Sequence, residues 1–147
     1  MKYFFEVSLL DEQIKDFLPF YKFATEQVAV GIHAIDLTGK TIIYNEKMKE
    51  IEGLNLTDVV DRSIFELFQF EQQESTLLKV LHSGEPVLRA KQTYWNRNGQ
   101  EITTINDTYP ICLEEKLIGA VEFSRDITAL ERLIYQPLQR YNDSITL

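Results

Sequence analysis

EITTINDTYPICLEEKLIGAVEFSRD, residues 101–126, is the stretch that decides the fold. It predicts two long antiparallel strands, about 101–112 and 116–125, joined by the charged turn Leu113-Glu114-Glu115-Lys116. Thr, Ile, Val, Tyr and Phe are frequent in both strands, and these residues favour a pleated, partly buried surface. Neither strand alternates cleanly between apolar and polar residues, so both faces of the sheet need cover. We therefore expect helices on one face and a further helix or a partner on the other.

The composition is typical of one acidic domain. The chain has 147 residues, of which 44% are hydrophobic and 12% aromatic, enough for a real core and too many for a disordered chain. The net charge of −8 disfavours a large nucleic-acid footprint, which needs basic patches. Cys112 is the single cysteine, which excludes an intramolecular disulfide. The apolar N-terminal stretch is short and contains Glu6, so we expect no signal peptide or membrane span and a cytoplasmic location.

The residues around the central pair predict the other elements. Residues 1–10 are unpatterned and are expected to form an arm. Apolar residues at three- and four-residue spacing predict a helix over 11–28, with Asp11 as N-cap and a kink or break at Pro19. This helix should cover the second face of the sheet. The remaining predicted elements are a hairpin (30–36 and 40–45), short helical segments (46–52, 56–60 and 63–68), a longer helix (71–82), a strand (87–96) and a last helix from 128 to about 135.

Five short features in this order resemble the PAS family of sensor domains over roughly residues 28–130. They are Asp36-Leu37-Thr38-Gly39-Lys40, Asn45, Ser83-Gly84-Glu85-Pro86, Asn98-Gly99 and Asp126-Ile127-Thr128. The resemblance implies an α+β fold, with a five-stranded antiparallel sheet in the order 2-1-5-4-3 and helices over one face that enclose a ligand cavity. We expect the N-terminal helix on the other face. The chain then divides into an arm and amphipathic helix (1–27), a sensor domain (28–128) and the start of a signalling helix (129–147).

The chain is also similar to the N-terminal sensor region of the sigma-54-dependent transcriptional activators that control arginine utilisation in bacilli. That similarity implies signal transmission to downstream ATPase and DNA-binding domains. The 147 residues contain neither a G-x-x-x-x-G-K-[ST] phosphate loop nor a basic recognition helix. We therefore interpret the chain as a sensor fragment of a longer regulator, which itself contacts no nucleic acid and no membrane.

The sequence offers little for catalysis or cofactor binding. His33 and His82 are the only histidines, which disfavours a catalytic triad or a zinc site. Flavin photosensors of the family resemble Gly-Arg-Asn-Cys-Arg, whereas this chain has Asp61-Arg62-Ser63-Ile64-Phe65, with Ile64 in place of the reactive cysteine. His82 ends the long helix, where pairing with the helix dipole explains it better than haem ligation. We predict a domain that is not an enzyme and has no cofactor or metal; a haem or flavin sensor is a weaker alternative.

Strand parity predicts a polar pocket on the inner face of the sheet. The register follows from matching Gly99 and Pro110 to the strand boundaries of the family. Buried polar groups need hydrogen bonds, and a buried carboxylate needs a partner or a proton, so a polar ligand with a cationic group would suit this face. By resemblance the ligand is similar to arginine, ornithine or citrulline. The predicted ligand-binding residues are Glu122, Asn106, Ser124, Thr104, Thr108, Tyr94, Gln92 and His33.

Two alternatives stay open at this point. A slip of one residue would line the pocket with Ile105, Asp107, Val121 and Phe123 and would place Glu122 in solvent. A dimerisation module with a water-filled interior and no ligand is the other alternative. The favoured register leaves an outward apolar set that is too large to face water, so we expect a homodimer in which a second copy covers part of it. That set is Trp95, Ile105, Tyr109, Leu117, Val121 and Phe123.

Overall fold

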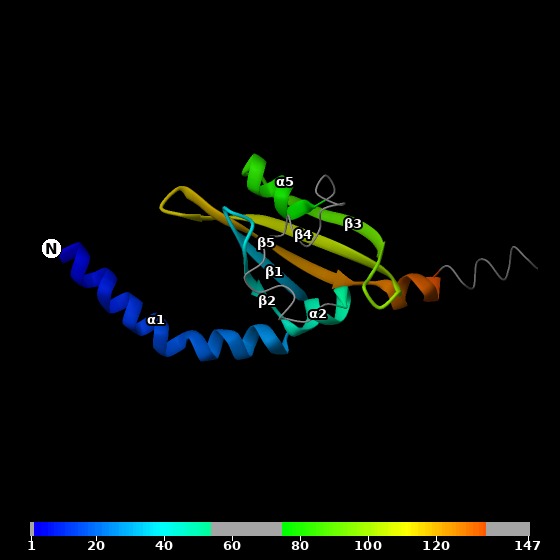
Figure 1. Ribbon diagram of the computed structural model, residues 1–147, viewed down its shortest axis with the longest axis horizontal. Helices are drawn as coiled ribbons and strands as arrows, with labels where there is room; N and C mark the ends of the chain where they lie inside the picture. The colour runs from blue at the N-terminus through cyan, green and yellow to red at the C-terminus, as the bar shows by residue number, and fades with distance from the viewer. Residues whose placement is uncertain (1, 54–74, 135–147) are drawn as a thin grey trace, which may run out of the picture.

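A five-stranded antiparallel sheet forms the centre of the molecule (Figure 1). The structure is a computed structural model that describes residues 2–53 and 75–134, with side chains from residue 15 onward. The strand order β2-β1-β5-β4-β3 confirms the predicted fold class. The strands are β1 (Gly31–Asp36), β2 (Thr41–Tyr44), β3 (Val87–Trp95), β4 (Glu101–Leu113) and β5 (Lys116–Asp126).

Helices α2 (Glu46–Glu52) and α5 (Thr76–Ser83) pack on one face of this sheet, α2 beside β1 and α5 over β4 and β5. The buried apolar side chains Ile35, Leu77, Val80 and Ala120 form the core between α5 and the sheet. After β5, residues 128–134 are helical, as the sequence predicts. The predicted helical segments 56–60 and 63–68, and the first residues of the predicted helix 71–82, lie outside the described residues.

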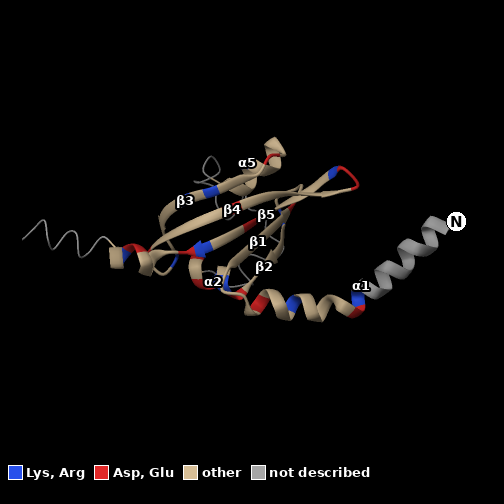
Figure 2. Cartoon of the chain, turned by 180° about the vertical axis from the view of Figure 1, so that it is seen from behind, with Lys and Arg blue, Asp and Glu red and all other residues tan. Residues whose placement is uncertain are grey.

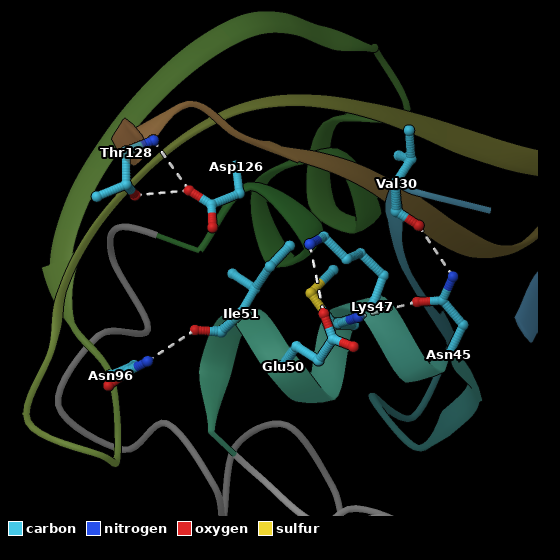
Figure 3. A network of polar contacts seen from close by, with 9 residues as sticks. Val30, Asn45, Lys47, Glu50, Ile51, Asn96, Asp126 and Thr128 are labelled. Atoms are coloured by element: carbon cyan, nitrogen blue, oxygen red, sulfur yellow. Dashed lines mark hydrogen bonds and ion pairs between the residues drawn. The ribbon is translucent and has the colours of Figure 1, made fainter. Parts of the chain in front are cut away.

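Asn45 ties three elements together at one end of the sheet (Figure 3). Its side-chain oxygen accepts hydrogen bonds from the backbone N–H groups of Ile32 and Met48, at 2.8 and 3.1 Å, so it is also the N-cap of α2. Its amide nitrogen donates to the carbonyl oxygens of Thr25 and Val30, at 2.8 and 2.9 Å. One buried side chain thus positions the end of the N-terminal helix, β1 and α2.

The turn between β3 and β4 packs on the last turn of α2. The Asn96 amide donates to the carbonyl oxygen of Ile51 at 3.1 Å, and the Arg97 backbone N–H donates to the carbonyl oxygen of Glu52 at 3.1 Å. Since α2 also lies beside β1, this short helix links both sides of the sheet. The inner face is therefore closed at this end by α2.

The N-terminal helix differs from the prediction in length and position. α1 (Lys2–Gln27) replaces both the expected arm and the expected shorter helix; Pro19 lies inside it, and Figure 1 shows it bent along its length. It extends away from the sheet instead of covering it, because contacts of its C-terminal end with Asn45 and Glu46 set its direction. Trp95, expected beneath this helix, is accordingly 69% exposed.

Candidate functional site

A row of polar side chains crosses the inner face of the sheet. In the strand register, Tyr44 of β2 lies opposite His33 of β1, His33 opposite Glu122 of β5, and Glu122 opposite Thr108 of β4. A second row continues beside it, with Ser124 opposite Asn106. Period-two alternation of the strands puts all these side chains on the face that α5 covers. The structure thus brings the predicted residues of β1, β4 and β5 to one surface, together with Tyr44 of β2.

Glu122 is the centre of the polar cluster. Its Oε2 accepts a hydrogen bond of 2.5 Å from the hydroxyl of Thr76 on α5, and that hydroxyl accepts one of 2.9 Å from Thr108. The Ser124 hydroxyl lies 3.4 Å from Oε1. Burial raises the pKa of the Glu122 carboxyl, while the hydrogen bonds from Thr76 and Ser124 act in the opposite direction. No cationic side chain among the described residues pairs with this carboxylate.

Asn106 extends the cluster towards β3. Its amide nitrogen donates to the Gln92 side chain at 2.9 Å, and its oxygen accepts from the Ser124 hydroxyl. Thr104, opposite Gln92, is fully buried, and its hydroxyl has no hydrogen-bond partner among the described residues. A buried hydroxyl left unpaired is costly, so this group is a specific place for a ligand atom or a water.

His33 and Tyr44 form the other side of the site. The His33 ring meets the Tyr44 ring edge to face at 5.0 Å, and its Nε2 lies 3.0 Å from the Thr41 hydroxyl. Complete burial lowers the pKa of His33 to about 4, so the ring is neutral at pH 7. His33 can therefore exchange a hydrogen bond with a ligand or with Thr41, but it adds no positive charge beside Glu122.

Three residues of the site were missed by the sequence analysis: Tyr44, Glu52 and Thr76. The Tyr44 hydroxyl donates to Glu52 Oε2 at 2.5 Å. Burial and then the Glu52 carboxylate raise the pKa of Tyr44 far above its usual value, with smaller contributions from Tyr94 and Glu122. Glu52 is thus a second carboxylate near the same interior. An acidic residue in the last turn of a helix interacts unfavourably with the helix dipole. This unfavourable position could have indicated from the sequence that Glu52 has a specific role.

The register of the sheet decides between the two predicted linings. Asp107 lies on the outer face, where its Oδ2 accepts a hydrogen bond of 2.7 Å from Arg125. Thr104, Asn106 and Thr108 are buried on the inner face. The lining by Ile105, Asp107, Val121 and Phe123 is therefore wrong.

The pKa of His33 leads to a pH-dependent prediction. The unfolded chain protonates His33 near pH 6.5, and the folded state does so only near pH 4. The free energy of unfolding therefore includes the full contribution of the neutral ring above pH 6.5. It falls by about 3 kcal/mol as the pH decreases from 6.5 to 4, because the unfolded chain takes up a proton that the folded chain does not. Urea denaturation at pH 7, 5.5 and 4 should show that His33→Gln loses less stability over this range than the wild type. Equal losses in the two proteins would contradict the buried neutral ring.

Neither a metal site nor a membrane span is found in the described part of the chain. Residues 2–53 and 75–134 contain no group of three His, Cys, Asp or Glu side chains that could hold a metal ion. None of the helices described there is long and apolar enough to cross a membrane. The absence of a metal or cofactor remains a prediction from the sequence.

The fold and the polar inner face define a PAS-type domain. The family model described as "PAS fold" matches residues 25–132, and the chain belongs to this family. Over 116 residues it is 45% identical to the transcriptional activator RocR of Bacillus subtilis (strain 168), an alignment that covers 78% of this chain. The alignment covers 25% of RocR, so the chain spans about a quarter of the length of this relative.

Solved structures share the fold at low sequence identity. The PAS domain of Bordetella pertussis BvgS superposes with a TM-score of 0.61 at 18% identity, covering 88% of this chain and 98% of that one. A PAS domain from Colwellia psychrerythraea gives 0.60 at 19% identity, covering 77% and 98%. An RNA-binding light-oxygen-voltage receptor gives 0.65 at 15% identity, covering 86% and 38%. At these identities the likeness concerns the fold alone.

Proposed function

We propose that this chain is the sensory domain of a cytoplasmic, sigma-54-dependent transcriptional activator, and that it binds a small polar metabolite with a cationic group, such as ornithine, arginine or citrulline. It acts by binding rather than by catalysis and passes the signal to downstream ATPase and DNA-binding domains. The relationship to RocR supports the regulatory role. The polar inner face supports the ligand class.

One observation carries the proposal: the inner face holds a desolvated, half-buried carboxylate, Glu122, and, four residues along β4 from the strand partner of Glu122, a buried hydroxyl, Thr104, that has no hydrogen-bond partner among the described residues. Glu122 is desolvated and receives hydrogen bonds from hydroxyl groups, which stabilise its charge less than a cation does. The Thr104 hydroxyl, on the same face, makes no hydrogen bond within the described part of the chain. An ammonium or guanidinium group at Glu122 would neutralise the charge, and the rest of the ligand would reach Thr104.

The substitution Glu122→Gln tests this role. It keeps the shape of the side chain and removes the charge, so binding should weaken about ten- to a hundredfold, since a charge-assisted hydrogen bond contributes roughly 1.5–3 kcal/mol. Calorimetric titration of wild type and variant with ornithine, arginine and citrulline measures the change. Glu50→Gln, at a carboxylate whose side chain is 68% exposed, is the matched control. Equal affinities for Glu122→Gln and wild type would rule out Glu122 as the group that recognises the cation.

The same variant has a predicted effect on stability. Because the folded state raises the pKa of Glu122, its ionised form costs stability at pH 7, and this cost disappears once the pH falls below the pKa of the unfolded chain. Glu122→Gln should therefore be as stable as the wild type or more stable at pH 7, and the two should converge below about pH 4. A clear loss of stability in the variant would mean that Glu122 has a structural role.

Hydrogen bonds of β4 connect the proposed ligand site with the final helix, and this connection would carry the signal. Thr104 faces the site, while its neighbour Thr103 faces outward and binds the start of the final helix: its N–H donates to the Thr128 hydroxyl at 2.9 Å, and its carbonyl accepts from Ile127 at 2.9 Å. An ion pair joins Lys91 of β3 to Glu131 of this helix, and it holds the pKa of Glu131 below its usual range. A ligand that shifts β4 would therefore shift the helix that leads to the next domain.

A ligand-free dimerisation module is the second candidate. The observation that favours it is that most polar groups of the inner face already pair with one another, as the chain from Thr108 through Thr76 to Glu122 shows. In that case none of the three metabolites would bind to the wild type in the titrations.

The proposal includes a homodimer formed through α1 and the outer face of the sheet. Deleting residues 1–27 removes the apolar helix that would cover the outer face of the sheet in the dimer. The exposed apolar surface should then cause aggregation or a change of oligomeric state. Light scattering after size-exclusion chromatography measures the mass of both forms. If the full chain and the truncated chain are both well-behaved monomers, the proposed dimer is wrong.

A further inference from the structure

Thr76 directs its hydroxyl to the ligand site and not to the start of its own helix. It is the first residue of α5, but the N-cap of α5 is Ser75, whose side chain accepts the backbone N–H of Leu78 at 3.3 Å. Thr76 is buried, and its hydroxyl donates to Glu122, 46 residues further along the chain. Since Ser75 supplies the cap, the formation of α5 does not explain the hydroxyl at position 76.

The hydrogen bond between Thr76 and Glu122 has the length of a charge-assisted one. Bonds from a hydroxyl to a carboxylate measure about 2.5–2.7 Å, and this bond measures 2.5 Å. Thr108 donates to the Thr76 oxygen at 2.9 Å, so the one proton of the Thr76 hydroxyl points to Glu122. A hydroxyl that accepts one hydrogen bond donates a stronger one. Thr108 and Thr76 together therefore stabilise the ionised form of Glu122.

The other carboxylate oxygen of Glu122, Oε1, is held less tightly. The Ser124 hydroxyl lies 3.4 Å from Oε1, but it has one proton and also contacts Asn106 Oδ1, which is the closer acceptor. Within the described part of the chain, Oε1 has no closer partner than Ser124. Glu122 is half-buried, whereas Thr76 and Thr108 are buried. Thr76 thus holds Oε2 from the side of α5, and Oε1 is the oxygen that a cationic group can reach.

Other titratable side chains lie on the elements around this cluster. They are His33 of β1, Tyr44 of β2, Glu52 of α2, Tyr94 of β3, and Lys79 and His82 of α5. Lys79 and His82 are exposed. Burial lowers the pKa of His33 to about 4 and raises the pKa of Tyr44 far above its usual value, so both are neutral at pH 7. The acidic tip of the β4–β5 hairpin lies beyond the end of α5 (Figure 2).

We propose that Thr76 is a positioning residue of the ligand site: its hydroxyl, supported by Thr108, holds Oε2 of Glu122 and keeps the carboxylate charged, so that Oε1 meets the cationic group of the ligand. This inference rests on the proposed function and adds the residue that prepares Glu122 for it. Desolvation by itself favours the neutral carboxyl, which does not attract a cation, and the Thr76 hydroxyl opposes this effect. α5 therefore belongs to the site as well as to the core.

Thr76→Val tests this role, because it keeps the shape of the side chain and removes the hydroxyl. The measurement is a pH titration of the carboxyl ¹³C signals of the glutamate-labelled chain without ligand, in which Glu122→Gln identifies the signal of Glu122. Thr76→Val should raise the titration midpoint of Glu122 by about one pH unit or more, since a hydrogen bond to the charged form is lost. Thr76→Ser keeps a hydroxyl and should titrate like the wild type.

Two further variants control for structural effects. Ser75→Ala removes the cap of α5 and keeps the bond to Glu122, so it should leave the midpoint unchanged. Thr76→Val leaves the Thr108 hydroxyl without its acceptor, and the double variant Thr76→Val/Thr108→Val removes both hydroxyls together. The double variant should show the same upward shift, and it decides the question if the single variant does not fold. Circular dichroism checks the fold of each variant.

Calorimetric titrations with ornithine, arginine and citrulline at pH 5, 6, 7 and 8 connect the charge of Glu122 to binding. Binding of a cationic group needs the ionised carboxylate, so affinity should fall as the pH falls through the midpoint of Glu122. In Thr76→Val this fall should begin at a higher pH, by the same amount as the shift of the carboxyl midpoint. A purely structural role of Thr76 would lower the affinity without moving its pH dependence.

The outcomes separate this inference from the proposed function. An upward shift of the midpoint in the valine variants, absent in Thr76→Ser and Ser75→Ala and followed by the affinity, supports the inference. An unchanged midpoint in the valine variants, or an equal shift in Ser75→Ala, overturns it. A shifted midpoint that the affinity does not follow overturns the role of Thr76 in binding while the ligand site stands. A wild type that binds none of the three metabolites overturns the proposed function and that role together.

Discussion

Gly119→Ala should destabilise the domain by about 3 kcal/mol or more, a large share of the roughly 5–15 kcal/mol typical of a domain. Gly119 of β5 lies opposite Asp36 of β1, in the centre of the sheet. A Cβ atom at this position would lie 2.2 Å from the carbonyl oxygen of Ile35. That atom belongs to the backbone and cannot rotate away, so β1 and β5 would have to separate. Chemical denaturation of the purified variant measures the loss.

The control for this variant is Gly84→Ala. Gly84 has a φ of 73°, and a Cβ atom added there would meet no other atom within 4 Å, so alanine at this position tests the cost of a left-handed backbone without a clash. That cost is about 1–2 kcal/mol. A loss at Gly119 no greater than the loss at Gly84 would show that the two strands accommodate the methyl group, and that the close approach is less rigid than the structure indicates.

Asn45→Ala should cost about 3–4 kcal/mol, since it removes four hydrogen bonds of roughly 1 kcal/mol each from a buried position. The variant should also free the end of α1, which is held through the Thr25 carbonyl. Thermal and urea denaturation give the stability. Enhanced proteolysis within α1 would report the release of the helix.

Ser75→Ala separates the capping contribution from the rest of this effect. Ser75 caps α5 by one hydrogen bond, to the N–H of Leu78 at 3.3 Å, and loss of such a cap costs about 1 kcal/mol. The excess of Asn45→Ala over Ser75→Ala measures the three contacts that Asn45 makes beyond its cap. Equal losses in the two variants would show that Asn45 acts only as an N-cap and does not hold the N-terminal helix.

Local sequence patterns predicted the parts of the fold that depend on neighbouring residues. The β-branched runs around the turn at Glu114 and Glu115 predicted the central hairpin. The period of two, with its register taken from the family resemblance, predicted Glu122 and Asn106 on the inner face. The predicted helical segment 46–52 coincides with α2, which Asn45 and Gly53 cap. In each case the signal and the structure lie within a few positions of each other.

The features that the sequence analysis missed depend on contacts between distant segments. Thr76 and Glu52 reach the site from helices whose placement follows from packing, and no local pattern states which side chain meets Glu122 or Tyr44. The direction of α1 was wrong for the same reason. It depends on hydrogen bonds made by Asn45 and Glu46, about twenty residues further along the chain.

The central claim is that the inner face of the sheet binds a metabolite with a cationic group. Its most direct test is a titration of the ¹⁵N-labelled chain with ornithine, arginine and citrulline, followed by amide chemical shifts. We expect one of them to cause saturable shifts at Thr104, Asn106, Thr108 and Ser124 and at Thr128 beyond the sheet, and Glu122→Gln to reduce them. Shifts confined to exposed residues, or no shifts with any of the three at millimolar concentration, would contradict the claim.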